Sequence, residues 1–339
     1  MPSAETPATP RADPRAILVA PDAFKGTFSA SVVAAAIGRG IEAAGLVPPD
    51  LMPVADGGEG TLDVLLPALG GETAGALARD PLGRERRAGF ALLEGGDGAL
   101  VETAQAIGLG LVPQDERDAE AATSHGAGDL IAAAIDAGAQ VIFVAVGGSA
   151  TTDGGAGAIE AVESRGGLRG ARLVVLCDVR VPFELAAERF APQKGADGAA
   201  VRRLAKRLER LAAGWPRDPR GVPMTGAAGG LAGGLWARLG AELEPGAAFV
   251  LRALDADARL QAARAVVVGE GRLDSTSLQG KITGELATRA RQGGVPCHAI
   301  AGSSTLDRFD RRMIDLQTVQ AAPTLAALEA AGRALAAFV

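Results

Sequence analysis

The stretch "QVIFVAVGGSATTDGGAGA" (residues 140–158) decides the fold class. Its first seven residues form an apolar run rich in β-branched side chains, which predicts a buried strand. From residue 146 onward it holds five glycines, three hydroxyl side chains and one carboxylate. Glycine lets the backbone approach a ligand closely, and parallel α/β sheets bind ligands beyond the carboxyl ends of their strands. The stretch therefore predicts a parallel sheet with a ligand-binding loop at a strand end.

The rest of the chain alternates short β-rich runs with Ala/Leu-rich helical patterns, which predicts βα units. Strands are expected at 15–22, 50–56, 140–146, 171–179, 264–271 and 295–304, and helices at 29–45, 58–69, 126–138, 197–215, 280–294 and 323–338. Between 70 and about 112 the pattern changes to extended segments joined by "PLG" and "GGDG" turns. That change predicts an antiparallel meander and a domain boundary near residue 70.

Composition restricts the classes of function. With 339 residues, 48% of them hydrophobic and 22% charged, the chain is globular and long enough for two domains. Its net charge is −6, and its positive and negative residues are interspersed along the chain. Both features argue against nucleic acid as a partner. The basic cluster at 202–210 is interpreted as one solvated helix face. Cys177 and Cys297 stand in apolar contexts and are expected to be buried thiols in a reducing compartment.

Targeting and membrane signals are not found in the sequence. The chain has no run of about 18 uncharged apolar residues, so we expect no transmembrane helix and no membrane partner. Residues 1–14 are rich in Pro, Ala and Thr without an apolar segment, which predicts a disordered leader and not a signal peptide. We therefore expect a soluble, cytoplasmic protein.

Acids, hydroxyls and glycines recur after the predicted strands. They are Asp22, Lys25 and Thr27; Asp56, Glu59 and Thr61; Ser149, Thr151, Thr152 and Asp153; Asp178; Glu270, Arg272, Asp274, Ser275 and Lys281; and Ser303 and Ser304. Any one of the acids or hydroxyls could cap a helix. Together they predict backbone N–H groups for phosphate, carboxylates for a divalent cation, and cationic side chains that stabilise a transferred charge.

Several familiar motifs are missing. "SLQGKIT" (277–283) imitates the end of a P-loop but lacks its first glycine, and "DGGAGAIE" is not a GxGxxG fingerprint. No GxSxG elbow occurs. The two histidines are far apart and give no zinc pattern. His298 is expected to be a satisfied core histidine, and His125 is the better candidate for a substrate contact.

The loops as a set resemble the type-1 glycerate kinase family, whose bacterial members phosphorylate D-glycerate with ATP. The matching stretches are "APDAFKGTFSA" (20–30), "VADGGEGT" (54–61), "GGSATTDGGAGA" (147–158), "FAPQKGA" (190–196), "GAAGGLAGGL" (226–235) and "GEGRLDSTSLQGK" (269–281). The resemblance implies a flavodoxin-like parallel-sheet domain joined to a second, restriction-enzyme-like α/β domain, with the site between them. On this basis we place the first domain at 15–70 and 265–339 and the second at 71–264.

The resemblance also implies ATP, Mg²⁺ and D-glycerate as ligands, with 2-phosphoglycerate as the product. On residue type and position, we assign Asp178, Asp153 and Lys25 as catalytic; Asp22, Gly148, Ser149, Thr151, Lys194, Arg272 and Lys281 to phosphate or substrate; and Asp56, Glu59 and Asp274 to the metal. Alternatives are a surface position for Lys194 and a helix-cap role for Asp56.

The sequence departs from the family pattern at a few positions. Val181 in "DVRVPF" (178–183) stands where members usually carry an Asn, and "HGAGD" (125–129) replaces a common Tyr-Gly-Thr-Gly-Glu stretch. Two alternatives therefore stay open: an altered paralogue that binds nucleotide or uses a related small hydroxy acid, and a hydrolase with the same metal site. We also leave a homodimer open.

Overall fold

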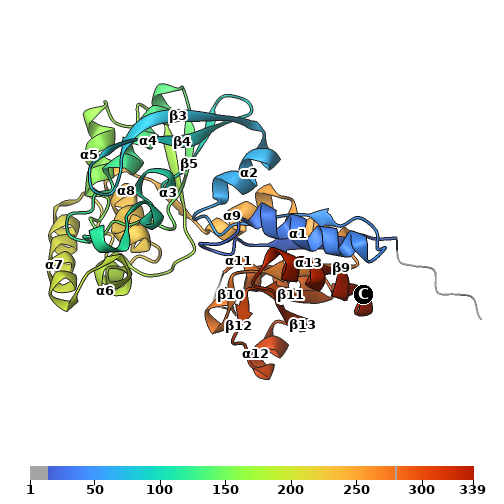
Figure 1. Ribbon diagram of the computed structural model, residues 1–339. Helices are drawn as coiled ribbons and strands as arrows, with labels where there is room; N and C mark the ends of the chain where they lie inside the picture. The colour runs from blue at the N-terminus through green and yellow to red at the C-terminus, as the bar shows by residue number, and fades with distance from the viewer. Residues whose placement is uncertain (1–13, 279–280) are drawn as a thin grey trace, which may run out of the picture.

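The computed structural model describes residues 14–278 and 281–339 and shows two α/β lobes, each built on its own sheet (Figure 1). The predicted leader at 1–14 lies outside these residues apart from Pro14. The predicted α/β class, with a parallel-sheet domain and a second α/β domain, is confirmed. The exact boundaries at residues 70 and 265 stay predictions.

The first lobe contains a parallel sheet with the strand order β13-β11-β9-β1-β2. Its strands are β1 (Ile17–Pro21), β2 (Asp50–Leu51), β9 (Ala265–Gly269), β11 (Cys297–Ala301) and β13 (Leu316–Ala321). Ile17 and Val19 pack on one face with helices α1 (Ala30–Ala43) and α13 (Leu325–Ala334). Leu18 and Ala20 point to the opposite face, toward α11 (Ile282–Gln292). Because both faces are covered, the central strands β1, β9 and β11 are fully buried and almost continuously apolar.

The second lobe contains a sheet with the order β3-β4-β5-β6-β7-β8. The strands are β3 (Gly71–Arg79), β4 (Glu85–Leu93), β5 (Gly98–Glu102), β6 (Val141–Ala145), β7 (Arg172–Leu176) and β8 (Glu242–Glu244). The first three pair antiparallel, as the meander predicted, and β5 to β8 pair in parallel. The meander prediction was wrong beyond residue 102, because the chain turns into helix α3 (Ala104–Ile107) there.

Helices cover both faces of the second sheet. On one face lie α4 (His125–Asp136) and α8 (Leu231–Leu239), packed with α5 (Ala156–Ser164). On the other lie α2 (Thr61–Leu69) and α9 (Gly246–Ala253), and their apolar contacts continue into the core of the first lobe. The two lobes therefore share one hydrophobic core through α2 and α9.

The remaining elements lie at the edges of the lobes. They are α6 (Ala186–Phe190) and α7 (Gly198–Gly214) in the second lobe, and α10 (Ala256–Ala262), β10 (Arg272–Leu273), β12 (Ser303–Ser304) and α12 (Arg308–Met313) in the first. Helix α7 buries Ala200, Leu204 and Leu208 and exposes its basic cluster, as predicted. In the part of the chain that the structure describes, no helix is both long and apolar enough to cross a bilayer.

Candidate active site

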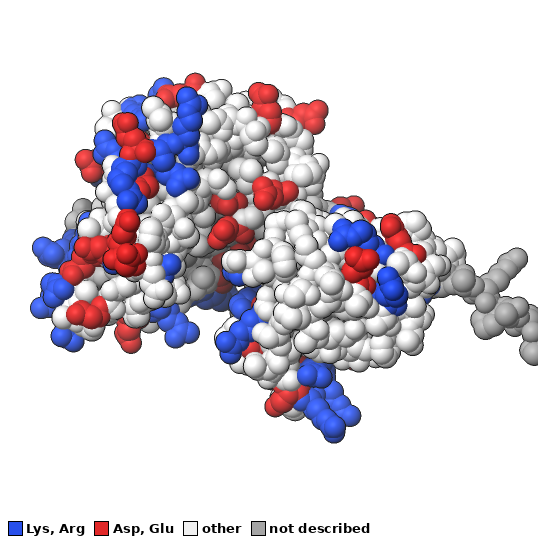
Figure 2. All heavy atoms as spheres, viewed as in Figure 1, with Lys and Arg blue, Asp and Glu red and all other residues white. Residues whose placement is uncertain are grey.

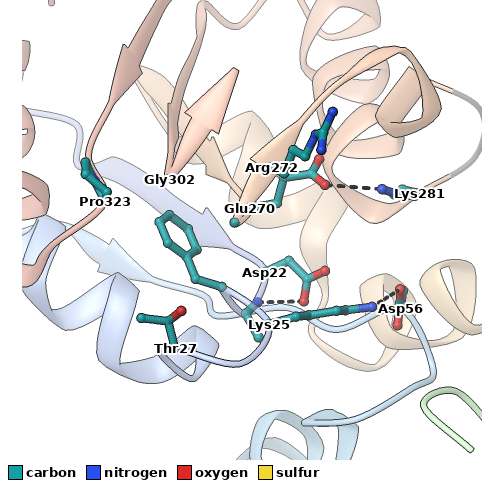
Figure 3. A pocket seen from close by; sticks show the side chains of 12 residues that line it. Asp22, Lys25, Thr27, Asp56, Glu270, Arg272, Lys281, Gly302 and Pro323 are labelled. Atoms are coloured by element: carbon teal, nitrogen blue, oxygen red, sulfur yellow. Dashed lines mark hydrogen bonds and ion pairs between the residues drawn. The ribbon is translucent and has the colours of Figure 1, made fainter. Parts of the chain in front are cut away.

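Two pockets meet where the strand-end loops of the two lobes face each other. The first pocket, of about 430 Å³, is lined by Asp22 after β1, Glu270 after β9, and Arg272 and Lys281 beyond them (Figure 3). The second pocket, of about 310 Å³, is lined by Gly148 and Ser149 after β6, Asp178 after β7, and Lys194. Lys25 and Asp56 line both pockets, and the Lys25 Nζ lies 3.3 Å from Asp56 Oδ2. This ion pair therefore stands at the junction of the two pockets.

The first pocket concentrates charge of both signs. Asp22 is 8% exposed, and burial, together with nearby Asp56, raises its pKa to about 7. The same Asp56 carboxylate raises the pKa of Lys25. Lys281 Nζ lies 3.5 Å from Glu270 Oε2. Glu270 was among the acids recognised at strand ends but was not assigned a role, although its place directly after β9 marked it as a candidate.

In the second pocket, Asp178 lies at the amino end of α9. The backbone N–H of Ala247 donates to its two carboxylate oxygens over 3.1 and 3.0 Å. Burial nevertheless raises the Asp178 pKa to about 7, because the ionised carboxyl loses hydration. A carboxylate that titrates near neutrality is suited to accept a proton from a hydroxyl group.

The Lys194 side chain lines the second pocket although it is almost completely buried. It is 3% exposed, so the surface-lysine alternative is wrong. Its ammonium donates to the Thr151 carbonyl and, over 3.3 Å, to Ser149 Oγ. Burial lowers its pKa to about 7, and the Asp153 carboxylate opposes that shift. A cation held in this way can bind a carboxylate or phosphate that enters the pocket.

Glycines bring the loops of the two lobes into contact. A Cβ atom on Gly147 would lie 2.5 Å from Gly58 Cα, and one on Gly58 would lie 3.2 Å from Gly147 Cα. Gly148 has φ +80°, which side chains rarely adopt, and its carbonyl accepts from Leu109 N over 2.8 Å. The glycines of the 140–158 stretch thus allow one loop to pack against another, and this packing places Asp56 and Ser149 in one pocket.

Some predicted residues lie outside the two pockets. Asp153 is 1% exposed, and its carboxylate accepts from Ser124 N and Oγ, both over 2.8 Å, and from Gly155 N and Gly157 N over 3.1 and 3.2 Å. This carboxylate fixes the starts of α4 and α5 and leaves no oxygen directed at a ligand. These contacts do not support the catalytic role expected for Asp153.

The three predicted metal ligands are not brought together. Glu59 lines a third pocket beside Asp63 and Glu102, which adjoins the first pocket at Lys25 and Thr27. The Asp274 carboxylate accepts from Thr276 N and Oγ1 over 2.9 and 2.6 Å, and these bonds lower its pKa. Among the described residues, no three His, Cys, Asp or Glu side chains form a ready-made metal cluster. One or two of these carboxylates would hold a divalent cation only together with oxygens of a bound ligand, as in Mg²⁺ sites at nucleotide phosphates.

Other sequence-based alternatives are settled by contacts. Asp56 Oδ1 accepts from Gly58 N over 3.1 Å, whereas α2 begins after Gly60 without a side-chain cap, so Asp56 is not a helix cap. Val181 lines a different pocket, with Pro182 and Leu185. The departure from the family pattern at Val181 therefore does not reach the second pocket directly.

The surface agrees with a small-molecule site. Figure 2 shows Lys, Arg, Asp and Glu mixed over both lobes, with a deep indentation between the lobes on this face. His298 is a core histidine as expected, 1% exposed with its Nδ1 2.9 Å from Thr318 Oγ1, but its buried Nε2 has no hydrogen-bond partner among the described residues, so only one ring nitrogen is satisfied. Both cysteines are buried.

Sequence comparison identifies the family. The sequence profile of the Glycerate kinase family matches residues 17–166 and 162–336. The chain belongs to the glycerate kinase family. The family resemblance and the kinase class predicted from the loop motifs are therefore confirmed.

Relatives match this glycerate kinase family member over most of their length. It is 37% identical to glycerate 2-kinase of Escherichia coli K12 over 330 residues, which cover 86% of each chain. It is 38% identical to glycerate kinase of Bacillus subtilis 168 over 333 residues, again 86% of each. A crystal structure of a Salmonella typhimurium LT2 protein assigned as glycerate kinase 2 superposes with a TM-score of 0.78 at 31% identity, covering 96% of this chain and 98% of that one.

Proposed function

We propose that this chain transfers the γ-phosphoryl group of ATP to the 2-hydroxyl of D-glycerate, giving 2-phosphoglycerate and ADP. The observation that carries the proposal is the pair of adjoining pockets with Lys25 and Asp56 at their junction. Relatives named as glycerate kinases support the substrate, and one is named as a 2-kinase, which supports the position.

ATP is assigned to the first pocket. Lys25, Arg272 and Lys281 line it and can bind phosphate oxygens. The pocket opens at the carboxyl ends of parallel strands, where α/β folds bind such ligands. Its volume of about 430 Å³ is in the range of small-molecule sites. The phosphate chain would run toward Lys25, at the entrance to the second pocket.

D-Glycerate is assigned to the second pocket. Its carboxylate would bind the Lys194 ammonium and the backbone N–H groups of Gly148 and Ser149, which line this cavity. Its 2-hydroxyl would then face Asp178. The buried cation and the small cavity favour a compact, anionic acceptor over a large neutral one.

The chemistry is an in-line displacement. The 2-hydroxyl oxygen forms a bond to the γ-phosphorus, the bond from that phosphorus to the β,γ-bridging oxygen breaks, and ADP leaves. Asp178 accepts the hydroxyl proton, as its pKa of about 7 allows. Lys25 stabilises charge on the transferred group because its ammonium lies at the junction.

The first pocket also fits Mg²⁺. Three carboxylates line it, Asp22, Asp56 and Glu270, and the buried Glu270 Oε1 has no hydrogen bond of good geometry in the described part of the chain. Hard cations prefer such oxygen ligands and, when bound, neutralise phosphate charge. A cytoplasmic location and a homodimer remain predictions.

The proposal is tested by coupled ADP release from Mg-ATP with D-glycerate, L-glycerate, glycolate or no acceptor. We expect saturable release with D-glycerate alone, and ³¹P NMR of the product should show phosphate on the 2-oxygen. ADP release that is equal without an acceptor would support the hydrolase alternative. Nucleotide binding without turnover on any acceptor would support the altered paralogue.

A further inference from the structure

Asp22 and Glu270 follow two strands that pair in register. Strands β1 and β9 are parallel, with Pro21 opposite Gly269 at their carboxyl ends, and Asp22 N donates to Gly269 O over 2.8 Å. The next residue on each strand is an acid. Because neighbouring strands lie about 4.8 Å apart, the sheet places both acids in the lining of the first pocket; in Figure 3 the Glu270 side chain points toward Lys281, and Asp22 lies between Glu270 and Lys25.

These neighbouring acids are deeply buried. Asp22 is 8% exposed and Glu270 is 7% exposed. Like charges on paired strands repel, and a carboxylate removed from water needs a compensating cation or hydrogen bonds. The pair therefore calls for a counter-charge within the pocket.

The lysines of the pocket do not supply it fully. Lys25 is engaged with Asp56 over 3.3 Å. Burial raises the pKa of Glu270, and the Ser277 hydroxyl, Lys281 and the Thr283 hydroxyl oppose that rise only in part. Lys281 Nζ lies 3.5 Å from Oε2, while the buried Oε1 has no hydrogen bond of good geometry among the residues described. A buried carboxylate oxygen left without a good hydrogen bond is costly in free energy. An oxygen-seeking cation would remove that cost.

We propose that Asp22 and Glu270 are the protein ligands of the divalent cation that accompanies the nucleotide. This assignment rests on the proposed function, which supplies the phosphate oxygens that complete the coordination. It replaces the set Asp56, Glu59 and Asp274 expected from the sequence. Both Asp56 oxygens are engaged, one by Lys25 and one by Gly58 N, Glu59 lines another pocket, and Asp274 is held by Thr276. One or two carboxylates with phosphate oxygens and water form the usual Mg²⁺ site of a kinase.

A hydroxyl group of the nucleotide is the competing partner for Glu270 Oε1. Such a donor would satisfy one oxygen but would leave the negative charges of Asp22 and Glu270 in one pocket. A cation satisfies both requirements at once. The two occupants also differ experimentally, because only the cation depends on both acids and can be observed without turnover.

The test uses Mn²⁺ as the probe, followed by electron paramagnetic resonance during titration of the full-length protein in the presence of ADP. Asp22→Asn and Glu270→Gln should each raise the Mn²⁺ concentration for half-saturation about tenfold or more, by analogy with losses of metal-site residues. Glu59→Gln and Asp274→Asn are matched controls, and their Mn²⁺ affinity should stay within twofold of wild type.

Two results would overturn the assignment: wild-type Mn²⁺ affinity in both Asp22→Asn and Glu270→Gln, or a larger loss in either control. Circular dichroism checks folding, and Glu270→Gln keeps the side-chain volume while removing a buried charge, so it is expected to fold. If the wild type binds Mn²⁺ through these acids but does not phosphorylate D-glycerate, the proposed function fails while the metal site stands. If the wild type phosphorylates D-glycerate and both variants keep the wild-type Mn²⁺ affinity, the metal assignment fails while the proposed function stands.

Discussion

Replacing Asp178 by Asn removes the proposed proton acceptor and little else. The amide keeps the side-chain volume, and its oxygen can still accept from Ala247 N at the start of α9. A positioned general base contributes about 10²- to 10⁴-fold to a rate, or roughly 3 to 5 kcal/mol of barrier. We expect kcat in the coupled ADP-release assay to fall by this factor, with the KM for ATP close to wild type.

The pH profile gives a second measure of the same residue. Burial raises the Asp178 pKa to about 7, and the carboxyl accepts a proton only when it is ionised. Wild-type kcat/KM, which reports groups of the free enzyme, should therefore fall about tenfold for each pH unit below 7. The residual activity of Asp178→Asn should lack this acidic limb.

Stability should move in the opposite direction to activity. Between about pH 4 and 7 folded Asp178 keeps a proton that the unfolded chain has lost, so the free energy of unfolding falls as pH rises through that window. The interval from 3.8 to about 7 corresponds to at most about 4 kcal/mol, and water in the open pocket reduces it. At pH 8, Asp178→Asn should thus unfold at least as high in temperature as wild type.

Asp153→Asn is the matched control, because Asp153 accepts four hydrogen bonds within the fold. It should lose about 1 to 3 kcal/mol of stability and should not remove the acidic limb of the pH profile. The reasoning fails if Asp178→Asn retains near wild-type kcat, or if its loss of activity comes with a fall in melting temperature like that of Asp153→Asn.

Three further predictions concern the junction and the second pocket. Lys194→Met should raise the KM for D-glycerate at least tenfold. In the wild type this KM should rise with pH above about 7, because the buried ammonium loses its proton there. Initial rates measured across pH test both predictions. Gly147→Ala should lower both kcat/KM and the melting temperature because its Cβ would meet Gly58 Cα at 2.5 Å, whereas Gly214→Ala, which meets nothing within 4 Å, should not. Lys25→Met should lower kcat about 10²- to 10³-fold while ADP affinity, measured calorimetrically, changes far less.

Much of the fold was predictable because its strands and helices carry strong periodic patterns. The run 140–146 gave β6, and 29–45 gave α1, since buried parallel strands and amphipathic helices differ clearly in sequence. The segment 316–321 (LQTVQA) was missed because β13 lies at the sheet edge and carries polar residues there. Of the predicted strand at 50–56, only Asp50 and Leu51 form the short strand β2; Met52 N and Val54 N still donate to Val19 O and Pro21 O of β1, and the chain then continues as the loop that carries Asp56.

The candidate site was predictable as a list of strand ends but not as a set of contacts. Asp22 and Lys25 follow a strand of the first sheet and Asp178 follows a strand of the second, and the carboxyl ends of parallel strands are where such sheets bind ligands. Lys194 was identified from the family motif and comes from the turn Pro192–Lys194, not from a strand end. Asp153 and Asp274 have the same residue type and similar positions, yet their oxygens are used by local N–H and hydroxyl donors. Which oxygens the fold consumes depends on donors from distant segments, such as Ser124 for Asp153, and sequence position does not reveal them.

The pairing of β1 with β9 has a consequence for synthesis of the protein. Strand β1 leaves the ribosome well before its partner β9, because the whole second lobe lies between them in the chain, and at about 5–20 residues per second that lobe takes on the order of ten to fifty seconds to synthesise. During that interval the strands of the second sheet, within residues 71–244, can already pair with one another, whereas β1 still lacks its neighbour β9. Asp22 and Glu270 therefore meet only late in translation, and a nascent chain that ends before β9 contains a folded lobe without a nucleotide site.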